Sequence, residues 1–239
     1  MQYMMMPLDE HYDRGFGSVA DAFQSAAMAL REAKPAPAFF DHLPQSFLFR
    51  HSVELFLKSG IVILHRRLKL PYGTEPYDSD PTIDLGTKRR PIWAVHNIGA
   101  LYQEWKSLIE PRTDELRDMC KFKPDWTIGP DMDAWIKTID AVDPSSTYFR
   151  YPSMKNPAED QQKSPFKKVA PAELFPENAP EGRRIMALVV ENTDGEVTRV
   201  YMNEKSSDEF GPYLTALLEA SKLLYCYHAM MRMELTGGF

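Results

Sequence analysis

The sequence predicts a mainly α-helical protein, a bundle of about five helices with a small β-hairpin inserted before the last helix. Three observations indicate this class. Apolar residues recur at intervals of three and four in several long segments, which is the period of helices packed on a core. Prolines and turn-forming residues separate these segments. Two β-rich runs flank Asp194-Gly195, a dipeptide that favours tight hairpin turns.

The first two helices carry clear start and stop signals. Ser18, with Asp21 three residues later, is the expected cap of the first helix, and the proline-rich segment 34–37 ends it. The second helix is expected from near Pro44 to about Leu70. Its segment 47–70 is apolar almost all round, which is typical of a helix buried in a bundle.

The remaining elements follow from periodicity and from helix-breaking residues. The sequence predicts, in order, a loop over 71–92, helices over about 96–109, 112–120 and 131–143, a loop over 150–184, strands near 184–191 and 197–202, and a last helix that a capping box of Ser206 and Glu209 begins.

A length of 239 residues suits one domain with an elaboration, or two small ones. We expect one helical domain over residues 15–239, with 150–205 as a loop and hairpin insertion within it. The net charge of −6 argues against broad electrostatic capture of nucleic acid. Two cysteines make no disulfide framework and fit a reducing compartment. No signal peptide is evident, and no apolar run approaches the ~20 residues of a membrane span. We therefore expect a cytoplasmic protein with no membrane partner.

The most informative feature is a polar stripe on the apolar second helix. Arg50, Glu54 and Lys58 recur at intervals of four, with His51 beside them. Residues four apart share one helical face, so these charges form a ladder. Buried charges are costly unless they are paired. The ladder must therefore face a cleft, a partner chain or its own counter-ions.

Other basic and imidazole groups complete a candidate site. The predicted ligand-binding residues are Arg50, His51, Glu54, Lys58, His96, Arg150 and Tyr151, and the catalytic candidates among them are Arg50, His51, His96 and Arg150. Arginine and lysine could bind phosphate while Glu54 orients them. Histidine could instead move a proton from a ribose hydroxyl in RNA cleavage without metal.

Structural roles are the competing interpretation of the same residues. The ladder could be an internal ion-pair network, and His96 could be a helix cap or first-turn residue. His228, on an apolar stripe, is expected to be a hydrogen-bonded core histidine, and Tyr102, Trp105 and Trp135 are expected in the core. The loop, elbow and metal motifs of P-loop, α/β-hydrolase and di-iron proteins are absent from the sequence, so we expect no cofactor and no metal.

In their order along the chain, three short motifs resemble the HEPN superfamily of prokaryotic helical proteins. They are Glu54-Leu-Phe-Leu-Lys58, His96-Asn-Ile-Gly-Ala-Leu101 and Arg150-Tyr-Pro152. The resemblance covers about residues 15–155 and the last helix. It implies a dimeric bundle of four or five helices that is linked to toxin–antitoxin, phage-defence or RNA-processing systems.

Catalytic members of that superfamily are metal-independent endoribonucleases with an arginine, four to six residues, and then a histidine. Arg90 and His96 match this spacing, and so do Arg89 and His96. The family pattern normally lies on a late helix, whereas these arginines lie in a predicted loop, which argues against nuclease activity. The resemblance thus implies a homodimeric regulatory subunit that binds RNA, a nucleotide or a protein partner. A metal-independent endoribonuclease and a structural homo-oligomer with a buried charge ladder are the alternatives.

Overall fold

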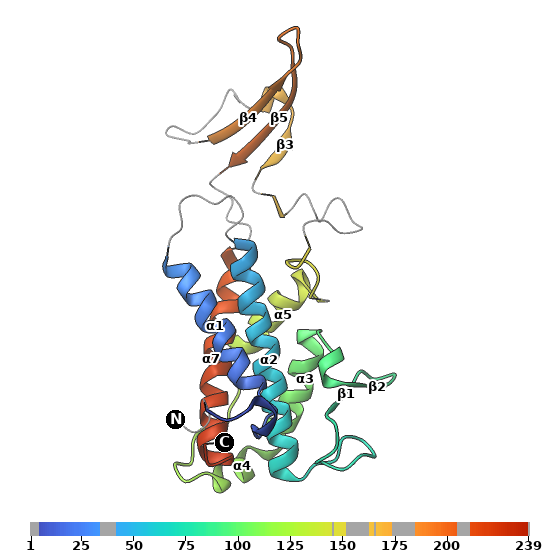
Figure 1. Ribbon diagram of the computed structural model, residues 1–239, viewed down its shortest axis with the longest axis vertical. Helices are drawn as coiled ribbons and strands as arrows, with labels where there is room; N and C mark the ends of the chain where they lie inside the picture. The colour runs from blue at the N-terminus through green and yellow to red at the C-terminus, as the bar shows by residue number, and fades with distance from the viewer. Residues whose placement is uncertain are drawn as a thin grey trace.

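The computed structural model describes residues 5–33, 42–144, 146–151, 163–164, 166–173, 185–204 and 211–238. It is mostly helical, with two small sheets (Figure 1). The elements are α1 (Phe16–Glu32), α2 (His42–Leu68), β1 (Thr82–Asp84), β2 (Arg89–Pro91), α3 (Ile98–Ile109), α4 (Thr113–Met119), α5 (Pro130–Val142), β3 (Lys167–Val169), β4 (Ile185–Glu191), β5 (Val197–Glu204) and α7 (Gly211–Leu235).

Helix α2 is the centre of the bundle, as its all-round apolar sequence predicts. It packs against α1, α3 and α7, and α5 packs against α7 and α3 (Figure 1). Almost every α2 residue from Phe49 to His65 is buried. Tyr102 and Trp105 of α3 are also buried, and Trp135 of α5 is partly buried against the same core. The aromatic stripe is therefore core, as expected.

The start of α1 differs from the predicted one. The helix begins at Phe16, and Ser18 lies within its first turn. The Asp13 carboxylate accepts hydrogen bonds from the backbone N–H groups of Gly15 and Gly17, at 3.0 and 2.7 Å. Asp13 thus satisfies donors that a helix start leaves open, which is the role that the sequence predicts for Ser18. The predicted capping box of Ser206 and Glu209 lies outside the described residues.

The segment 71–92, predicted as a loop, contains a small antiparallel sheet. Strand β1 pairs with β2, with Ile83 opposite Arg90. Ile83 and Ile92 are fully buried, and Tyr72 stacks on the His65 ring with centroids 4.0 Å apart. Three apolar side chains therefore attach this segment to the bundle, although its sequence has no strand period.

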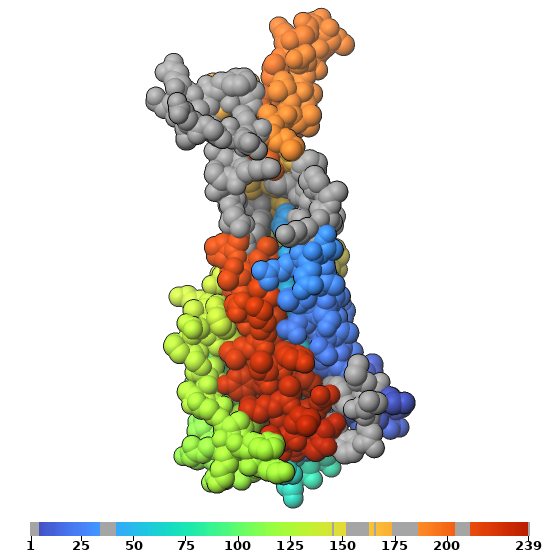
Figure 2. All heavy atoms as spheres, turned by 90° about the vertical axis from the view of Figure 1, so that its left-hand side faces the viewer, coloured from blue at the N-terminus to red at the C-terminus, as the bar shows by residue number. Residues whose placement is uncertain are grey.

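The hairpin at Asp194-Gly195 is confirmed. Strands β4 and β5 pair antiparallel, and Gly195 has the positive φ of 80° that this turn requires. A third strand, β3, pairs with the other side of β5 and was missed in the segment predicted as a loop over 150–184. The sheet, in the order β3-β5-β4, lies beyond one end of the bundle, and the β4–β5 hairpin projects from it (Figures 1 and 2). None of the helices in the described ranges has the length and apolar character to cross a membrane.

Candidate functional site

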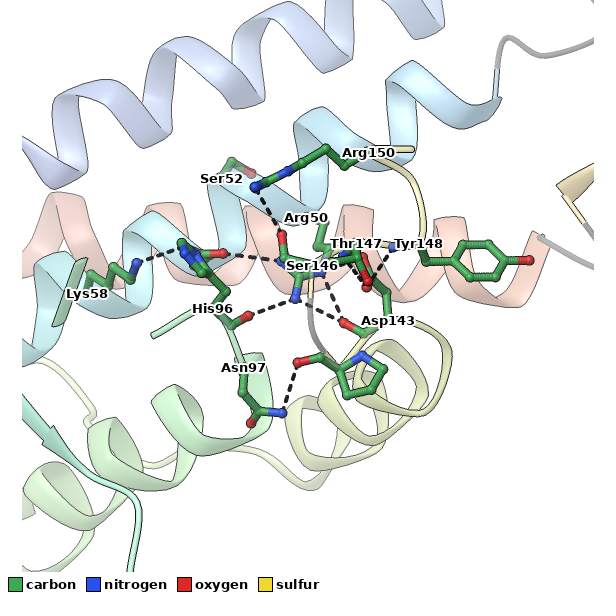
Figure 3. Close-up of polar contacts among 12 residues, drawn as sticks. Arg50, Ser52, Lys58, His96, Asn97, Asp143, Ser146, Thr147, Tyr148 and Arg150 are labelled. Carbon is green, nitrogen blue, oxygen red and sulfur yellow. Dashed lines mark hydrogen bonds and ion pairs between the residues drawn. The ribbon is translucent and has the colours of Figure 1, made fainter. Parts of the chain in front are cut away.

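The three ladder residues of α2 lie on one buried face of the helix, as their spacing predicts. Arg50, Glu54 and Lys58 are each at most 2% exposed. They face the segment that leads into α3 and the residues that follow α5 (Figure 3). The apolar residues on the other faces of α2 pack against its neighbours, and this packing fixes the direction of the charged face.

Glu54 is the common acceptor of this group. Its Oε1 accepts from Lys58 Nζ at 2.7 Å and contacts His96 Nδ1 at 2.9 Å, and its Oε2 accepts from Arg50 Nη1 at 3.2 Å. Burial acts to raise the pKa of the Glu54 carboxyl. The charges of Lys58 and Arg50, and the hydrogen bonds from Lys58 and His96, outweigh burial and hold this pKa below its ordinary value. Glu54 is therefore ionised at neutral pH.

Arg50 connects three parts of the chain. Its Nη2 donates to the carbonyl oxygens of His96 and Asp143, at 2.8 and 3.0 Å. Its Nε lies 3.1 Å from Asp143 Oδ2. Asp143 Oδ1 accepts the N–H groups of Thr147 and Tyr148, so it also holds the turn after α5. Acceptors within the protein thus occupy the Arg50 guanidinium.

These four charges neutralise one another. Arg50 and Lys58 are cations, and Glu54 and Asp143 are carboxylates, so the formal charge of the group is zero. From the sequence alone, the ladder could face a cleft, a partner chain or its own counter-ions. The structure shows counter-ions, and they come from the same chain. We call Arg50, Glu54, Lys58 and Asp143 the buried charge network. It needs no partner chain to be neutral.

His96 connects the buried charge network to the surface. Its side chain is 41% exposed, while its Nδ1 lies against the buried Glu54. Because Glu54 is ionised, Nδ1 carries the proton and donates to it, which leaves Nε2 as an acceptor. The cap of α3 is Asn97, whose side chain accepts from Ala100 N. His96 is therefore not the helix cap, and its ring is oriented by a carboxylate.

Arg150 and Tyr151 lie beside the network and not within it. Arg150 is exposed and donates from Nη2 to Ser146 Oγ at 3.5 Å (Figure 3). Its guanidinium also lies over the Phe47 ring, 5.8 Å from the ring centroid. No hydrogen bond joins Arg150 to Glu54 or Lys58 in the described contacts. Tyr151 is also exposed, and its carbonyl accepts from Lys163 Nζ at 2.9 Å.

His51 points to a different part of the bundle. Its ring stacks on Phe47, with centroids 5.9 Å apart, and meets the edge of Phe23 of α1 at 4.5 Å. Its Nδ1 is buried and has no hydrogen-bond partner in the described structure. Burial lowers the pKa of His51 below its ordinary value. The structure thus brings Arg50, Glu54, Lys58 and His96 together but places His51 in an aromatic contact between α1 and α2.

Asp13, Ser59 and His228 form a second buried polar group, which was not predicted from the sequence. Ser59 of α2 donates to Asp13 Oδ2, and its Oγ lies 3.0 Å from His228 Nδ1 of α7. The expectation of a hydrogen-bonded core histidine at His228 is confirmed. Ser59 is fully buried, and its hydroxyl is committed to Asp13, so this group joins α1, α2 and α7 and offers no accessible nucleophile. The sequence signal that we missed is an aspartate three residues before a helix.

A cleft of about 420 Å³ lies between α3 and α5. Asn97, which follows His96 in the chain, is one of its lining residues. The charged residues that line the cleft are Asp133, Asp140 and Lys137. Asp133 binds Tyr102 and Lys106, and Asp140 accepts from Asn97 at 3.1 Å. The carboxylates make this cleft a poor site for phosphate. No group of three or more His, Cys, Asp or Glu in the described ranges is placed to hold a metal ion.

Comparisons with models of protein families, with curated proteins and with solved structures found no match.

Proposed function

We propose that this chain is a HEPN-like subunit that binds RNA or a nucleotide at a surface that carries His96 and Arg150, which flank the buried Arg50 in Figure 3. The observation that carries the proposal is the His96 imidazole, which a buried ionised carboxylate orients while 41% of the side chain stays exposed. An imidazole held in this way accepts a ribose hydroxyl through Nε2 or, when protonated, donates to a phosphate oxygen.

Arg150 supplies the exposed cation of this surface. Its contact with the Phe47 ring limits the directions of the side chain, and its guanidinium keeps donors for a phosphate. Arg50, Glu54 and Lys58, predicted as ligand-binding residues, act in this proposal as positioning residues for His96. Arg50 is saturated by internal acceptors, and Lys58 is buried. The resemblance to HEPN proteins supports RNA or a nucleotide as the ligand class and a place in a bacterial toxin–antitoxin or defence system.

Binding of a fluorescently labelled single-stranded RNA, measured by anisotropy at two salt concentrations, tests the proposal. We expect weak binding that falls with salt, because the net charge supplies no general attraction. Arg150→Ala should weaken binding and reduce the salt slope by about one. Arg117→Ala is the matched control, because it removes an exposed arginine of α4 whose ion pair within the described residues is with the exposed Asp114. Equal loss in both variants would contradict a local site.

A metal-independent endoribonuclease is the second candidate, and the Glu54–His96 pair favours it. A histidine that a carboxylate orients is a suitable general base for a ribose hydroxyl. The binding proposal expects intact RNA after incubation in excess chelator, because the late-helix arginine-to-histidine pattern is absent. Chelator-resistant cleavage that disappears in His96→Ala would establish the ribonuclease instead.

A further inference from the structure

The two edges of the β3-β5-β4 sheet differ in how they are protected. Edge strand β3 is three residues long and carries Lys167 and Lys168. Short length and lysines are features with which proteins prevent an edge from pairing with another chain. Edge strand β4 has seven residues, and its first six, Ile185 to Val190, are uncharged. Of the two described edge strands, β3 thus has these protective features and β4 does not.

Exposed apolar side chains are concentrated on β4. Val189 is 40% exposed, whereas its cross-strand partner Val200, on the same face of the sheet, is 1% exposed. On the other face, Met186 is 43% and Leu188 is 58% exposed. On this face of the sheet, Val200 of the middle strand is therefore buried, whereas Val189 of the edge strand is exposed. In the part of the chain that the structure describes, no further strand lies beside β4 to cover these side chains.

The β4 backbone offers the hydrogen bonds for such a strand. In an antiparallel pair, every second residue directs its N–H and C=O away from its partner strand. Since β5 lies on one side of β4, the outward groups have no strand partner among the described residues. Figure 1 shows β4 as the outermost strand on the side away from β3.

We propose that β4 pairs antiparallel with β4 of a second copy of this chain, about a two-fold axis at Leu188. In this register Leu188 faces its own copy, Met186 faces Val190 and Ala187 faces Val189, so apolar residues meet on both faces. The product is a continuous sheet in the order β3-β5-β4-β4-β5-β3, in which the lysine-bearing strands form both outer edges.

A second copy fits this edge better than a foreign strand. A two-fold contact requires a surface that is complementary to itself. Residues 185–190 satisfy this because they carry no charge that would meet its like across the axis. The same stretch offers no charge by which a basic or acidic peptide would be selected. This inference does not depend on the ligand of the His96 surface.

Sedimentation velocity of the full chain at several concentrations tests the proposal. We expect a dimer that dissociates on dilution. The dimeric fraction should rise as the protein concentration increases through about 10–100 µM, the range of a weak specific interface. Leu188→Lys should give a monomer, because two ammonium groups would meet at the axis. Met233→Lys, at an exposed position of α7, is the matched control and should leave the dimer intact. A wild-type monomer throughout, or a dimer that Leu188→Lys does not change, would overturn the proposal.

Cross-linking tests the register. In a Cys226→Ser background, which removes the exposed natural cysteine, Leu188→Cys should form an intermolecular disulfide on oxidation. Its two Cα atoms would lie about 5 Å apart, within the reach of a disulfide. Asp194→Cys, at the hairpin turn, should stay reduced because the two copies would be about 40 Å apart. Equal cross-linking of the two variants would contradict the proposed pairing.

Discussion

Removing the charge of Glu54 is the most informative perturbation of the buried charge network. In Glu54→Gln, Lys58 loses the carboxylate that lies 2.7 Å from its Nζ, and Arg50 loses one at 3.2 Å. All three side chains are buried, so water cannot replace the lost partner. Removal of one member of a buried ion pair costs about 3–5 kcal/mol. We expect the free energy of unfolding to fall by that amount, a large share of the roughly 5–15 kcal/mol of a typical domain.

Urea unfolding at neutral pH, followed by circular dichroism, measures this change. Glu219→Gln is the matched control, because Glu219 and Lys222 form an ion pair of similar length, 2.9 Å, on the exposed side of α7. An exposed pair contributes about 0–1 kcal/mol. Adding Lys58→Met to Glu54→Gln removes the unpaired cation and should recover part of the lost stability. If Glu54→Gln costs no more than Glu219→Gln, the network does not stabilise the fold through charge pairing.

The pH dependence gives a second readout of the same variant. The pKa of Glu54 lies below its ordinary value in the folded protein, because Lys58 and Arg50 outweigh the effect of burial. Its contribution is therefore present above the unfolded pKa of about 4.3 and is lost as pH falls through the folded value. Stability curves of wild type and Glu54→Gln should converge in acid. A difference that stays constant down to the acid transition would refute the assignment of an ionised Glu54.

Three further variants test other contacts of the fold. Asp143→Asn should destabilise the protein by a similar amount to Glu54→Gln, because Arg50 loses a carboxylate 3.1 Å from its Nε; urea unfolding measures this. Gly60→Ala should lower the melting temperature and alter the near-ultraviolet circular dichroism, because its new Cβ would lie 2.6 Å from Trp105 Nε1. The low pKa of His51, caused by burial, means that wild type loses stability as pH falls below about 6.5. His51→Phe should remove that part of the pH dependence, and an unchanged pH profile would contradict it.

Helical periodicity explains what the sequence could predict of the site. Arg50, Glu54 and Lys58 recur every four residues, so their common face followed from helix geometry alone. The grouping of His51 with them did not hold, because adjacent residues on a helix are about 100° apart. That rotation directs His51 toward Phe23 of α1.

Long-range partners and short strands were beyond the reach of periodicity. Asp143 appeared only as a helix-terminating residue, although it is the second counter-ion of Arg50. Nothing local in the sequence signals a pairing between α2 and the end of α5. Strands β1, β2 and β3 have three residues each, too few to show an alternating pattern. The Asp194-Gly195 hairpin was predictable because turn residues and two longer β-rich runs coincide there.

The central claim, that an RNA or nucleotide ligand meets the His96 surface, is tested most directly by NMR of the six histidines, labelled with 13C at Cε1. Adding a single-stranded oligoribonucleotide in excess chelator should shift the His96 signal progressively. The signal of the buried His228, which lies against Ser59 between α2 and α7, should stay in place. Arg150→Ala should require more RNA for the same shift. A saturating shift at His228 with none at His96, or no shift at any RNA concentration, would contradict the account.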